Sequence, residues 1–146
     1  MTLPPLGLLV FFALGWASPA LADPCKAIPD RGPAPSWARP DYSVTGPVRY
    51  VADGDGLCVG ASPDPATWVE IRLADFYAPE LREPGGAAAK AMLVRVTRGR
   101  IVTCTAVRGR GRTVTYDRLI AVCRLDGVSL GDLMRRSGIA EGGAGR

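Results

Sequence analysis

The stretch at residues 68–80 (Trp-Val-Glu-Ile-Arg-Leu-Ala-Asp-Phe-Tyr-Ala-Pro-Glu) constrains the fold more than any other part of the chain. Apolar and charged residues alternate over 69–73, and this period of two predicts a half-buried β-strand. Pro79 has no amide hydrogen for a ladder, so we expect the strand to stop at 78–79. Arg72 within the strand and Glu80 just past its end could then converge on one site at a sheet edge.

The remaining chain predicts four more strands and two helices. Alternation, Asp-Gly turns and glycine breaks place the elements as follows: strands at 47–52 and 57–59 joined by a turn at 53–56, a helix at 87–97, strands at 100–107 and 118–125, and a short helix at 129–137. Five short strands with a helix after the third predict an α+β protein built on a partly open OB-type barrel. Barrels of this type bind nucleic acids and oligosaccharides.

The first 22 residues have the composition of an export signal. They contain no Lys, Arg, Asp or Glu, residues 6–16 are apolar, and Ala-Leu-Ala at 20–22 is a small-x-small cleavage signature. We expect cleavage after Ala22 and a periplasmic or secreted protein without stable membrane insertion; the alternative is an uncleaved anchor. The rest divides into an irregular arm at 23–45, one domain at 46–141 and a flexible tail at 142–146.

The charge of the chain suits an anionic partner. It has 18 basic and 14 acidic residues, a net charge of +4, which is also ordinary for a soluble domain. The basic run at 108–112 (Arg-Gly-Arg-Gly-Arg) is interpreted as a solvated hairpin tip in preference to a dedicated nucleic-acid patch. Histidine is absent from the sequence, which excludes Ser-His and Cys-His triads and histidine-ligated zinc.

Four cysteines behind an export signal predict two disulfides, with three pairings to choose from. Cys104 and Cys123 lie on two strands joined by a single loop, so antiparallel pairing would place them side by side. The pairing Cys104–Cys123 is therefore favoured, and Cys25–Cys58 follows by elimination. The second bond would tether the irregular arm to the first hairpin.

Ordered motifs give the chain a family resemblance. They are Val-Ala-Asp-Gly-Asp-Gly at 51–56, Arg-Leu-Ala at 72–74 with Ala-Pro-Glu at 78–80, Tyr-Asp-Arg at 116–118, and Leu-Met-Arg-Arg-Ser-Gly-Ile-Ala at 133–140. Each motif is weak alone, but their order across residues 46–141 is fairly specific. The chain resembles the thermonuclease (staphylococcal nuclease-like) domain family, as an exported bacterial member.

The resemblance implies a site for metal-assisted phosphodiester hydrolysis. Asp55 would ligate Ca²⁺, with Asp53 as a further acid of the same turn. Arg72 and Arg118 would grip the scissile phosphate, with Tyr116 beside a terminal phosphate. Fixed guanidiniums match phosphoryl oxygens, and a hard cation neutralises developing charge.

Glu80 would position and activate the attacking water, a task that a carboxylate performs without histidine. The sequence departs from the family at Tyr77, which stands where the family has its second aspartate ligand. A neutral phenol is a poor Ca²⁺ ligand, since its oxygen carries no full charge below about pH 10. Asp75 shares the strand parity of Tyr77 but would lie about 7 Å away along an extended strand.

These observations leave different functions open. The first is a nuclease that hydrolyses DNA or RNA, acting as a monomer on single-stranded or frayed nucleic acid. The second is a catalytically weak or inactive OB module that binds nucleic acid or another anionic or envelope partner. The third is a structural protein that uses only the disulfide-stapled fold. Glu80 with both arginines favours the first, and Tyr77 favours the other two.

Overall fold

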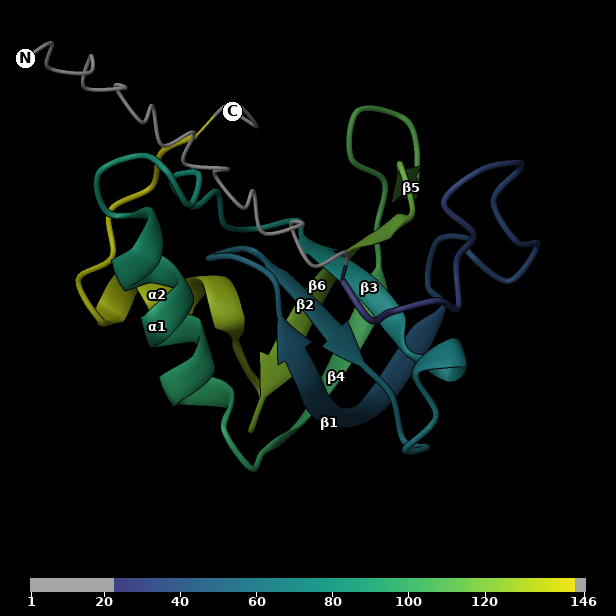
Figure 1. The fold of residues 1–146 in the computed structure, drawn as a ribbon, viewed down its shortest axis with the longest axis horizontal. Helices are drawn as coiled ribbons and strands as arrows, with labels where there is room; N and C mark the ends of the chain where they lie inside the picture. The colour runs from purple at the N-terminus through teal and green to yellow at the C-terminus, as the bar shows by residue number, and fades with distance from the viewer. Residues whose placement is uncertain (1–22, 144–146) are drawn as a thin grey trace, which may run out of the picture.

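Figure 1 shows a computed structural model of the chain, which describes residues 23–143. The expected signal peptide at 1–22 and the last residues, 144–146, lie outside the described part. The elements are β1 (Ser43–Val51), β2 (Gly56–Val59), a 3-10 turn η1 (Pro65–Thr67), β3 (Val69–Leu73), α1 (Gly86–Thr97), β4 (Ile101–Ala106), β5 (Val114–Thr115), β6 (Arg118–Leu125), β7 (Val128–Ser129) and α2 (Leu130–Arg136).

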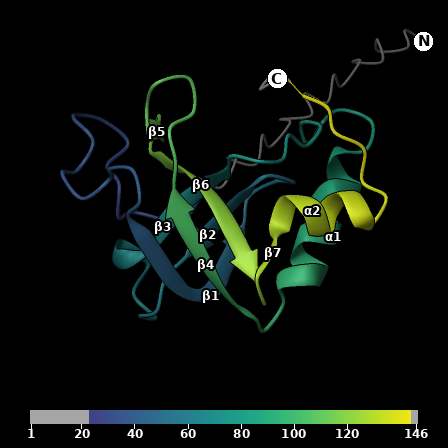
Figure 2. The ribbon, with the colours of Figure 1, turned by 180° about the vertical axis from the view of Figure 1, so that it is seen from behind.

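Five of the strands close into a mixed barrel. Antiparallel pairing runs through β3, β2, β1, β4 and β6, and a parallel pairing of β3 with β6 closes the circle. The closing register joins Ile71 to Leu119 and Leu73 to Ala121. The short strands β5 and β7 both pair with β6 (Figure 2). The predicted α+β class and five-stranded OB-type barrel are confirmed, with a helix after β3 and a short one at the C-terminal end, but the barrel is closed and not partly open.

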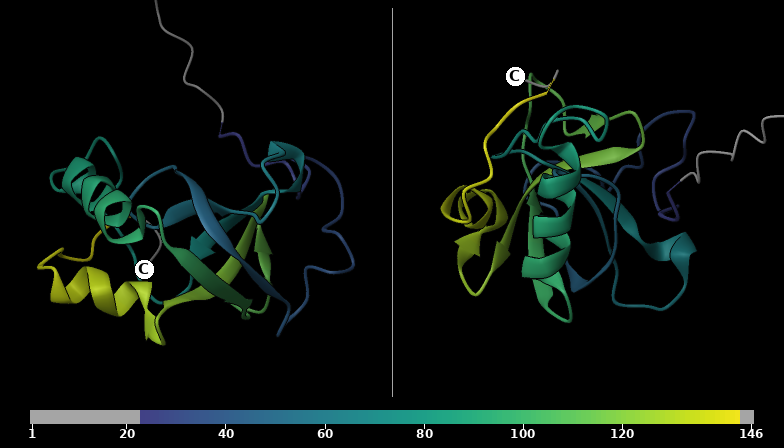
Figure 3. Two further views of the ribbon diagram at one scale, coloured as in Figure 1. Left: turned by 90° about the horizontal axis from the view of Figure 1, so that it is seen from below. Right: turned by 60° about the vertical axis from the view of Figure 1, so that its left-hand side comes forward.

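Both helices lie at one end of the barrel and extend its core (Figure 3). Ala89 and Leu93 of α1 are fully buried, as are Leu130 and Met134 of α2. The alanine-rich sequence of α1 favours a helix. Ser129 caps α2 as expected, because its side chain accepts the amide hydrogen of Asp132 at 3.0 Å.

The helix α1 begins where the chain passes very close to itself. A Cβ atom at Gly86 would collide with the carbonyl oxygen of Glu80, so only glycine fits there. This contact fixes the start of α1 against the segment that carries Glu80.

The central strand differs from its prediction in two ways. First, β3 ends at Leu73 and not at 78–79, so the expectation that Pro79 ends the strand is wrong. The amide of Ala74 still donates to the carbonyl of Ala121 in β6 at 2.9 Å, but further along the chain Tyr77 donates to the Glu141 carboxylate at 3.3 Å and Ala78 to the Asp55 carboxylate at 2.9 Å. Segment 74–80 is therefore an irregular connection, and strand parity does not relate the residues within it.

Second, β3 is covered on both faces and is not half-buried. Glu70 on its outer face is only 7% exposed. The covering chain is the N-terminal arm, whose residue Ala27 donates its amide hydrogen to the carbonyl of Trp68 at 3.1 Å. Sequence alternation could not reveal this cover, because the arm itself has no periodic pattern.

Strand β1 begins at Ser43, four residues before the expected position 47. Its first residues pair with β4, and two hydroxyl pairs cross this ladder, Ser43 with Thr105 and Thr45 with Thr103, each at 2.9 Å. Cross-strand hydroxyl pairs stabilise antiparallel sheets. They account for strand structure in a segment that composition alone predicts to be irregular.

Two disulfides join the four cysteines, Cys25 with Cys58 and Cys104 with Cys123. Cys104 and Cys123 are direct cross-strand partners on β4 and β6. The first bond holds the arm against β2. Two disulfides in a small protein indicate an oxidising environment.

Within residues 23–143, no helix has the length and apolar character that crossing a membrane requires.

Candidate nucleic-acid interface

A cavity of about 890 Å³ gathers most of the predicted site residues. Arg72 reaches it from β3, Glu80 from segment 74–80, and Arg118 from the start of β6. Tyr116 and Tyr77 also line it. Residues that are far apart in sequence meet here because the parallel pairing of β3 with β6 brings the two arginine-bearing strands together.

The basic loop at 108–112 lines the same cavity, which the sequence interpretation as a solvated hairpin tip did not anticipate. Its contributions to the wall are Arg108, Arg110 and Arg112. Together with Arg72 and Arg118, they give the cavity five arginines against a single carboxylate, that of Glu80. The high density of arginine in this loop could have indicated a binding role, but the sequence does not show toward which part of the barrel the hairpin points. The side chains that line the cavity therefore carry mostly positive charge.

Tyr116 is the most exposed aromatic side chain of the site, at 86%. It sits in the two-residue turn between β5 and β6, with a positive φ of 57° that few side chains adopt. The guanidinium of Arg118 lies 5.9 Å from the centre of its ring. The turn thus presents an aromatic face and a cation to the same ligand.

Arg72 is held from two sides. Its Nη1 donates to Asp55 Oδ1 at 3.1 Å, and its guanidinium lies 5.5 Å from the centre of the Tyr77 ring. The side chain remains 18% exposed, so one edge can meet a ligand. Tyr77 therefore contacts Arg72 through its ring, where a carboxylate at the same position would compete with Asp55 for the guanidinium.

Asp55 is engaged inside the protein. It is 5% exposed, and its second oxygen, Oδ2, accepts the amide hydrogen of Ala78 at 2.9 Å. Burial raises the pKa of Asp55 to about 6, opposed by the Ala78 amide and the Arg72 guanidinium and assisted by the charge of Asp53. Asp55 joins the turn at 53–56 to segment 74–80.

The donor set around Asp55 does not fit the Ca²⁺ that the resemblance implies. Asp53 uses Oδ1 to accept the amide hydrogen of Asp55 at 3.0 Å, and both oxygens of Asp55 already have partners. Neither aspartate belongs to a cluster of three or more potential ligands within residues 23–143. Ca²⁺ takes six to eight oxygens. The turn therefore supports the wall of the cavity, and its two carboxylates are not joined by a third potential ligand within residues 23–143.

Segment 74–80 is also held by the end of the chain, which sequence reasoning missed. The amide of Gly142 donates to the carbonyl of Tyr77 at 2.9 Å. The carboxylate of Glu141 accepts from the amide of Tyr77 and, at 3.1 Å, from Arg135 of α2. No signal in the sequence links the glycine-rich end to this segment.

No protein-family model matches the chain, and a search of curated proteins finds no significant match. What the fold and the site define is a class: an α+β protein with a closed five-stranded OB-type barrel and an arginine-rich cavity on it.

Proposed function

We propose that the cavity binds single-stranded nucleic acid. The observation that carries this proposal is the convergence of five arginines and two tyrosines on one cavity of about 890 Å³. Guanidiniums bind phosphate oxygens through paired, charge-assisted hydrogen bonds. Exposed aromatic rings such as Tyr116 stack on unpaired bases, and OB barrels use this combination to bind single strands.

A binding measurement tests the proposal. Fluorescence anisotropy with a labelled oligothymidine should show saturable binding that weakens steeply as salt is raised. R118Q should lose about tenfold in affinity, because a charge-assisted phosphate contact is worth about 1.5 kcal/mol or more. Y116A should weaken binding with little change in the salt slope. R95Q is the matched control, since Arg95 is exposed on α1 outside the cavity.

Binding that is as tight for R118Q, Y116A and R95Q as for the wild type would contradict the proposal. So would affinity that does not change with salt.

A second candidate function is hydrolysis of the bound phosphodiester. The observation that favours it is that Glu80, the one carboxylate of the cavity wall, shares that wall with Arg72 and Arg118. In this step a water oxygen attacks phosphorus while Glu80 accepts a proton from the water. The bond from phosphorus to the leaving sugar oxygen breaks, and that oxygen takes a proton from solvent. The two arginines stabilise the charge that develops on the phosphoryl oxygens.

Cleavage of single-stranded DNA by the oxidised protein separates the two functions. E80Q should abolish cutting and leave oligothymidine affinity within about twofold, because the amide keeps the shape but cannot take the proton. E83Q is the control, since Glu83 is exposed and outside the cavity wall, and a glutamine there can still accept the Glu80 amide hydrogen that Glu83 accepts at 3.0 Å. Wild-type binding without cutting, in Ca²⁺ and in chelator alike, would leave the binding function and reject the hydrolytic one.

We further propose that the protein is exported and works in an oxidising compartment. The two disulfides support this location. Fractionation of the native host with detection of the chain and its amino-terminal residue would test it. A full-length chain in the reducing cytoplasm would contradict it.

A further inference from the structure

Three carboxylates from distant parts of the chain meet outside the arginine-rich cavity. Asp23 belongs to the N-terminal arm, Glu70 to β3, and Asp117 to the turn between β5 and β6. One oxygen from each lies within 4.8 Å of one oxygen from each of the others. We call these three residues the carboxylate cluster.

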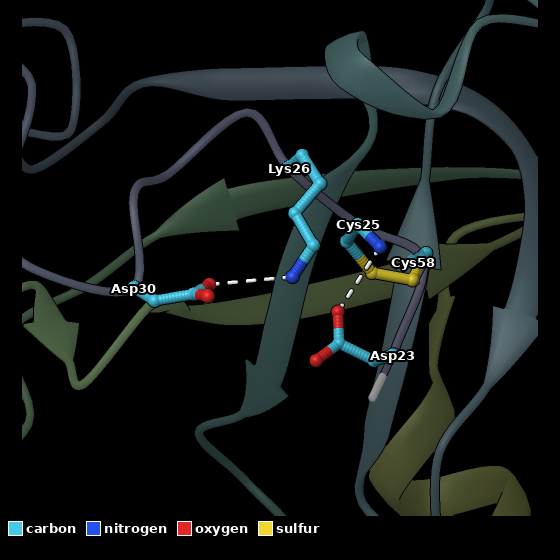
Figure 4. The surroundings of a disulfide bond; sticks show 5 residues. All are labelled: Asp23, Cys25, Lys26, Asp30 and Cys58. Carbon is cyan, nitrogen blue, oxygen red and sulfur yellow. Dashed lines mark hydrogen bonds and ion pairs between the residues drawn. A yellow bond between two sulfur atoms is a disulfide. The ribbon is translucent and has the colours of Figure 1, made fainter. Parts of the chain in front are cut away.

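The fold itself assembles the cluster. Glu70 is the cross-strand partner of Cys58, and Cys58 is bonded to Cys25 of the arm. Figure 4 shows Asp23 beside this disulfide, where its carboxylate accepts the amide hydrogen of Cys25 at 3.0 Å. Asp117 immediately precedes β6, the strand that pairs with β3. The cluster therefore depends on barrel closure and on the tethered arm.

Glu70 is the buried member and lacks a partner. The residue is 7% exposed, and its Oε2 atom is buried without any hydrogen bond in the described structure. Burying a carboxylate oxygen without a partner costs free energy, because the oxygen loses its hydrogen bonds to water and gains none from the protein. The pKa of Glu70 is raised to about 7, mainly by burial and also by the charges of Asp23 and Asp117, against the opposing charge of Arg118. Burial and mutual repulsion therefore both disfavour a state in which all three carboxylates are ionised and no cation is bound.

The cationic side chains near the carboxylate cluster, Lys26 and Arg118, contact other groups. Figure 4 shows the ammonium of Lys26 directed at Asp30, with the two charged atoms 3.3 Å apart. The guanidinium of Arg118 lies near the Tyr116 ring and lines the cavity. Among the ion pairs of residues 23–143, none involves a carboxylate of the cluster.

We propose that Asp23, Glu70 and Asp117 bind one calcium ion. Carboxylate oxygens are the ligands that hard divalent cations prefer, and Asp23 and Asp117 are partly exposed, so water can complete the coordination. With bonds of about 2.4 Å, Ca²⁺ bridges oxygens up to about 4.8 Å apart, whereas Mg²⁺ reaches only about 4.2 Å and demands stricter geometry. The flexible coordination geometry of Ca²⁺ suits ligands from three separate parts of the chain better than the strict octahedron of Mg²⁺.

This site is separate from the turn of Asp53 and Asp55 that the family resemblance indicates. Its three ligands include none of the residues proposed to touch nucleic acid. The inference therefore does not rest on the proposed function, and either can fail alone.

Titration calorimetry of the oxidised protein with CaCl₂ tests the site. We expect one calcium per chain, weaker binding of MgCl₂, and a rise in melting temperature on adding CaCl₂. E70Q and D117N should each lower calcium affinity at least tenfold and remove the thermal shift. D126N is the matched control, because Asp126 occupies the turn at the opposite end of β6. D53N should also bind calcium like the wild type.

Both substitutions within the cluster keep the side-chain shape and remove a buried or repelling charge, so the variants should fold; circular dichroism checks this. A chain cut after Ala22 would carry an α-ammonium on Asp23 that competes with calcium, so the titration is run on the full chain and on the cut chain. Absence of calcium binding in both forms overturns the proposal. Binding that survives in E70Q and D117N, or that D53N abolishes, overturns it as well.

Discussion

Asp55 keeps its position in the motif at 51–56, but its carboxylate bonds to groups inside the protein. Its carboxylate is shared between the Arg72 guanidinium and the Ala78 amide, and this sharing ties the first hairpin to the cavity wall. The motif at 51–56 correctly predicted a turn with two carboxylates. The sequence could not show that hydrogen bonds from β3 and segment 74–80 would occupy both oxygens of Asp55.

D55A should destabilise the protein by about 3 kcal/mol, because it leaves a buried amide without an acceptor and a largely buried guanidinium without its counter-charge. D53N provides the comparison. Asparagine can still accept the amide hydrogen of residue 55, so its cost should stay within about 0.5 kcal/mol. Urea unfolding at pH 7 measures both. Equal costs for the two variants would show that the Asp55 contacts contribute nothing beyond the turn.

Glu70 should make stability depend on pH. The pKa of its carboxyl is about 7 in the folded protein and 4.5 ordinarily, so the folded state binds the extra proton between these values. Stability from this group is therefore complete below about pH 4.5 and is lost as the pH rises toward 7. The loss relative to E70Q should approach about 3 kcal/mol, from 1.36 kcal/mol per pH unit.

Urea unfolding of wild type and E70Q from pH 5 to pH 8, with chelator present, checks this dependence. The difference between the two curves isolates Glu70 from Asp55, whose pKa is also raised. Curves that stay parallel across this range would refute the expectation.

At the level of elements, segment 74–80 carries the largest difference between sequence and structure. Proline was expected to end β3, but the strand ends at Leu73, and the amides of Tyr77 and Ala78 bond to side chains from elsewhere in the chain. The sequence pattern identified the five strands of the barrel, but the short strands β5 and β7 were not predicted. The course of segment 74–80 depends on long-range hydrogen bonds, which a local pattern does not contain.

The candidate site shows the same division. Arg72, Glu80, Tyr116 and Arg118 were predicted together from ordered motifs, and the structure brings them to one cavity. The arginine loop at 108–112 also lines this cavity, because its hairpin is oriented toward the same side of the barrel. The carboxylate cluster was not predicted, since its members share no motif and meet only through barrel closure and the arm.

G86A tests how firmly α1 holds the cavity wall. The added methyl group would overlap the Glu80 carbonyl, so either the helix start or the Glu80 backbone must move. We expect a loss of about 2 to 3 kcal/mol, typical of overpacking, and weaker oligothymidine binding. A87G is the control at the next, exposed position and should cost about 1 kcal/mol or less. Thermal unfolding in which G86A matches A87G would refute the close contact.

Across the whole molecule, the two disulfides have different tasks. Cys104–Cys123 links neighbouring strands of the barrel. Cys25–Cys58 attaches the N-terminal arm, which otherwise makes few backbone hydrogen bonds to the barrel. The chain-entropy model gives each bond about 3 to 4 kcal/mol of stability. The two disulfides should therefore contribute similar free energies of unfolding although they hold different parts of the structure.

Replacing Cys25 and Cys58 together by alanine should lower stability by about 3 to 4 kcal/mol and also expose the outer face of β3. Replacing Cys104 and Cys123 should cost a similar amount but leave the arm in place. Hydrogen exchange distinguishes them: the amide of Ala27 should lose protection only in the first variant. Protection of Ala27 in both variants would mean that the arm holds itself without the bond.

The tether at Cys25 has one further consequence. Asp23 is only two residues away, so a chain with reduced thiols would present Glu70 and Asp117 without their third carboxylate. Oxidation and calcium binding would then be thermodynamically linked, and linkage is reciprocal. Whatever factor the disulfide adds to calcium affinity, calcium must add to the resistance of that disulfide to reductants. Bound calcium would then protect the disulfide that helps to assemble its own binding site.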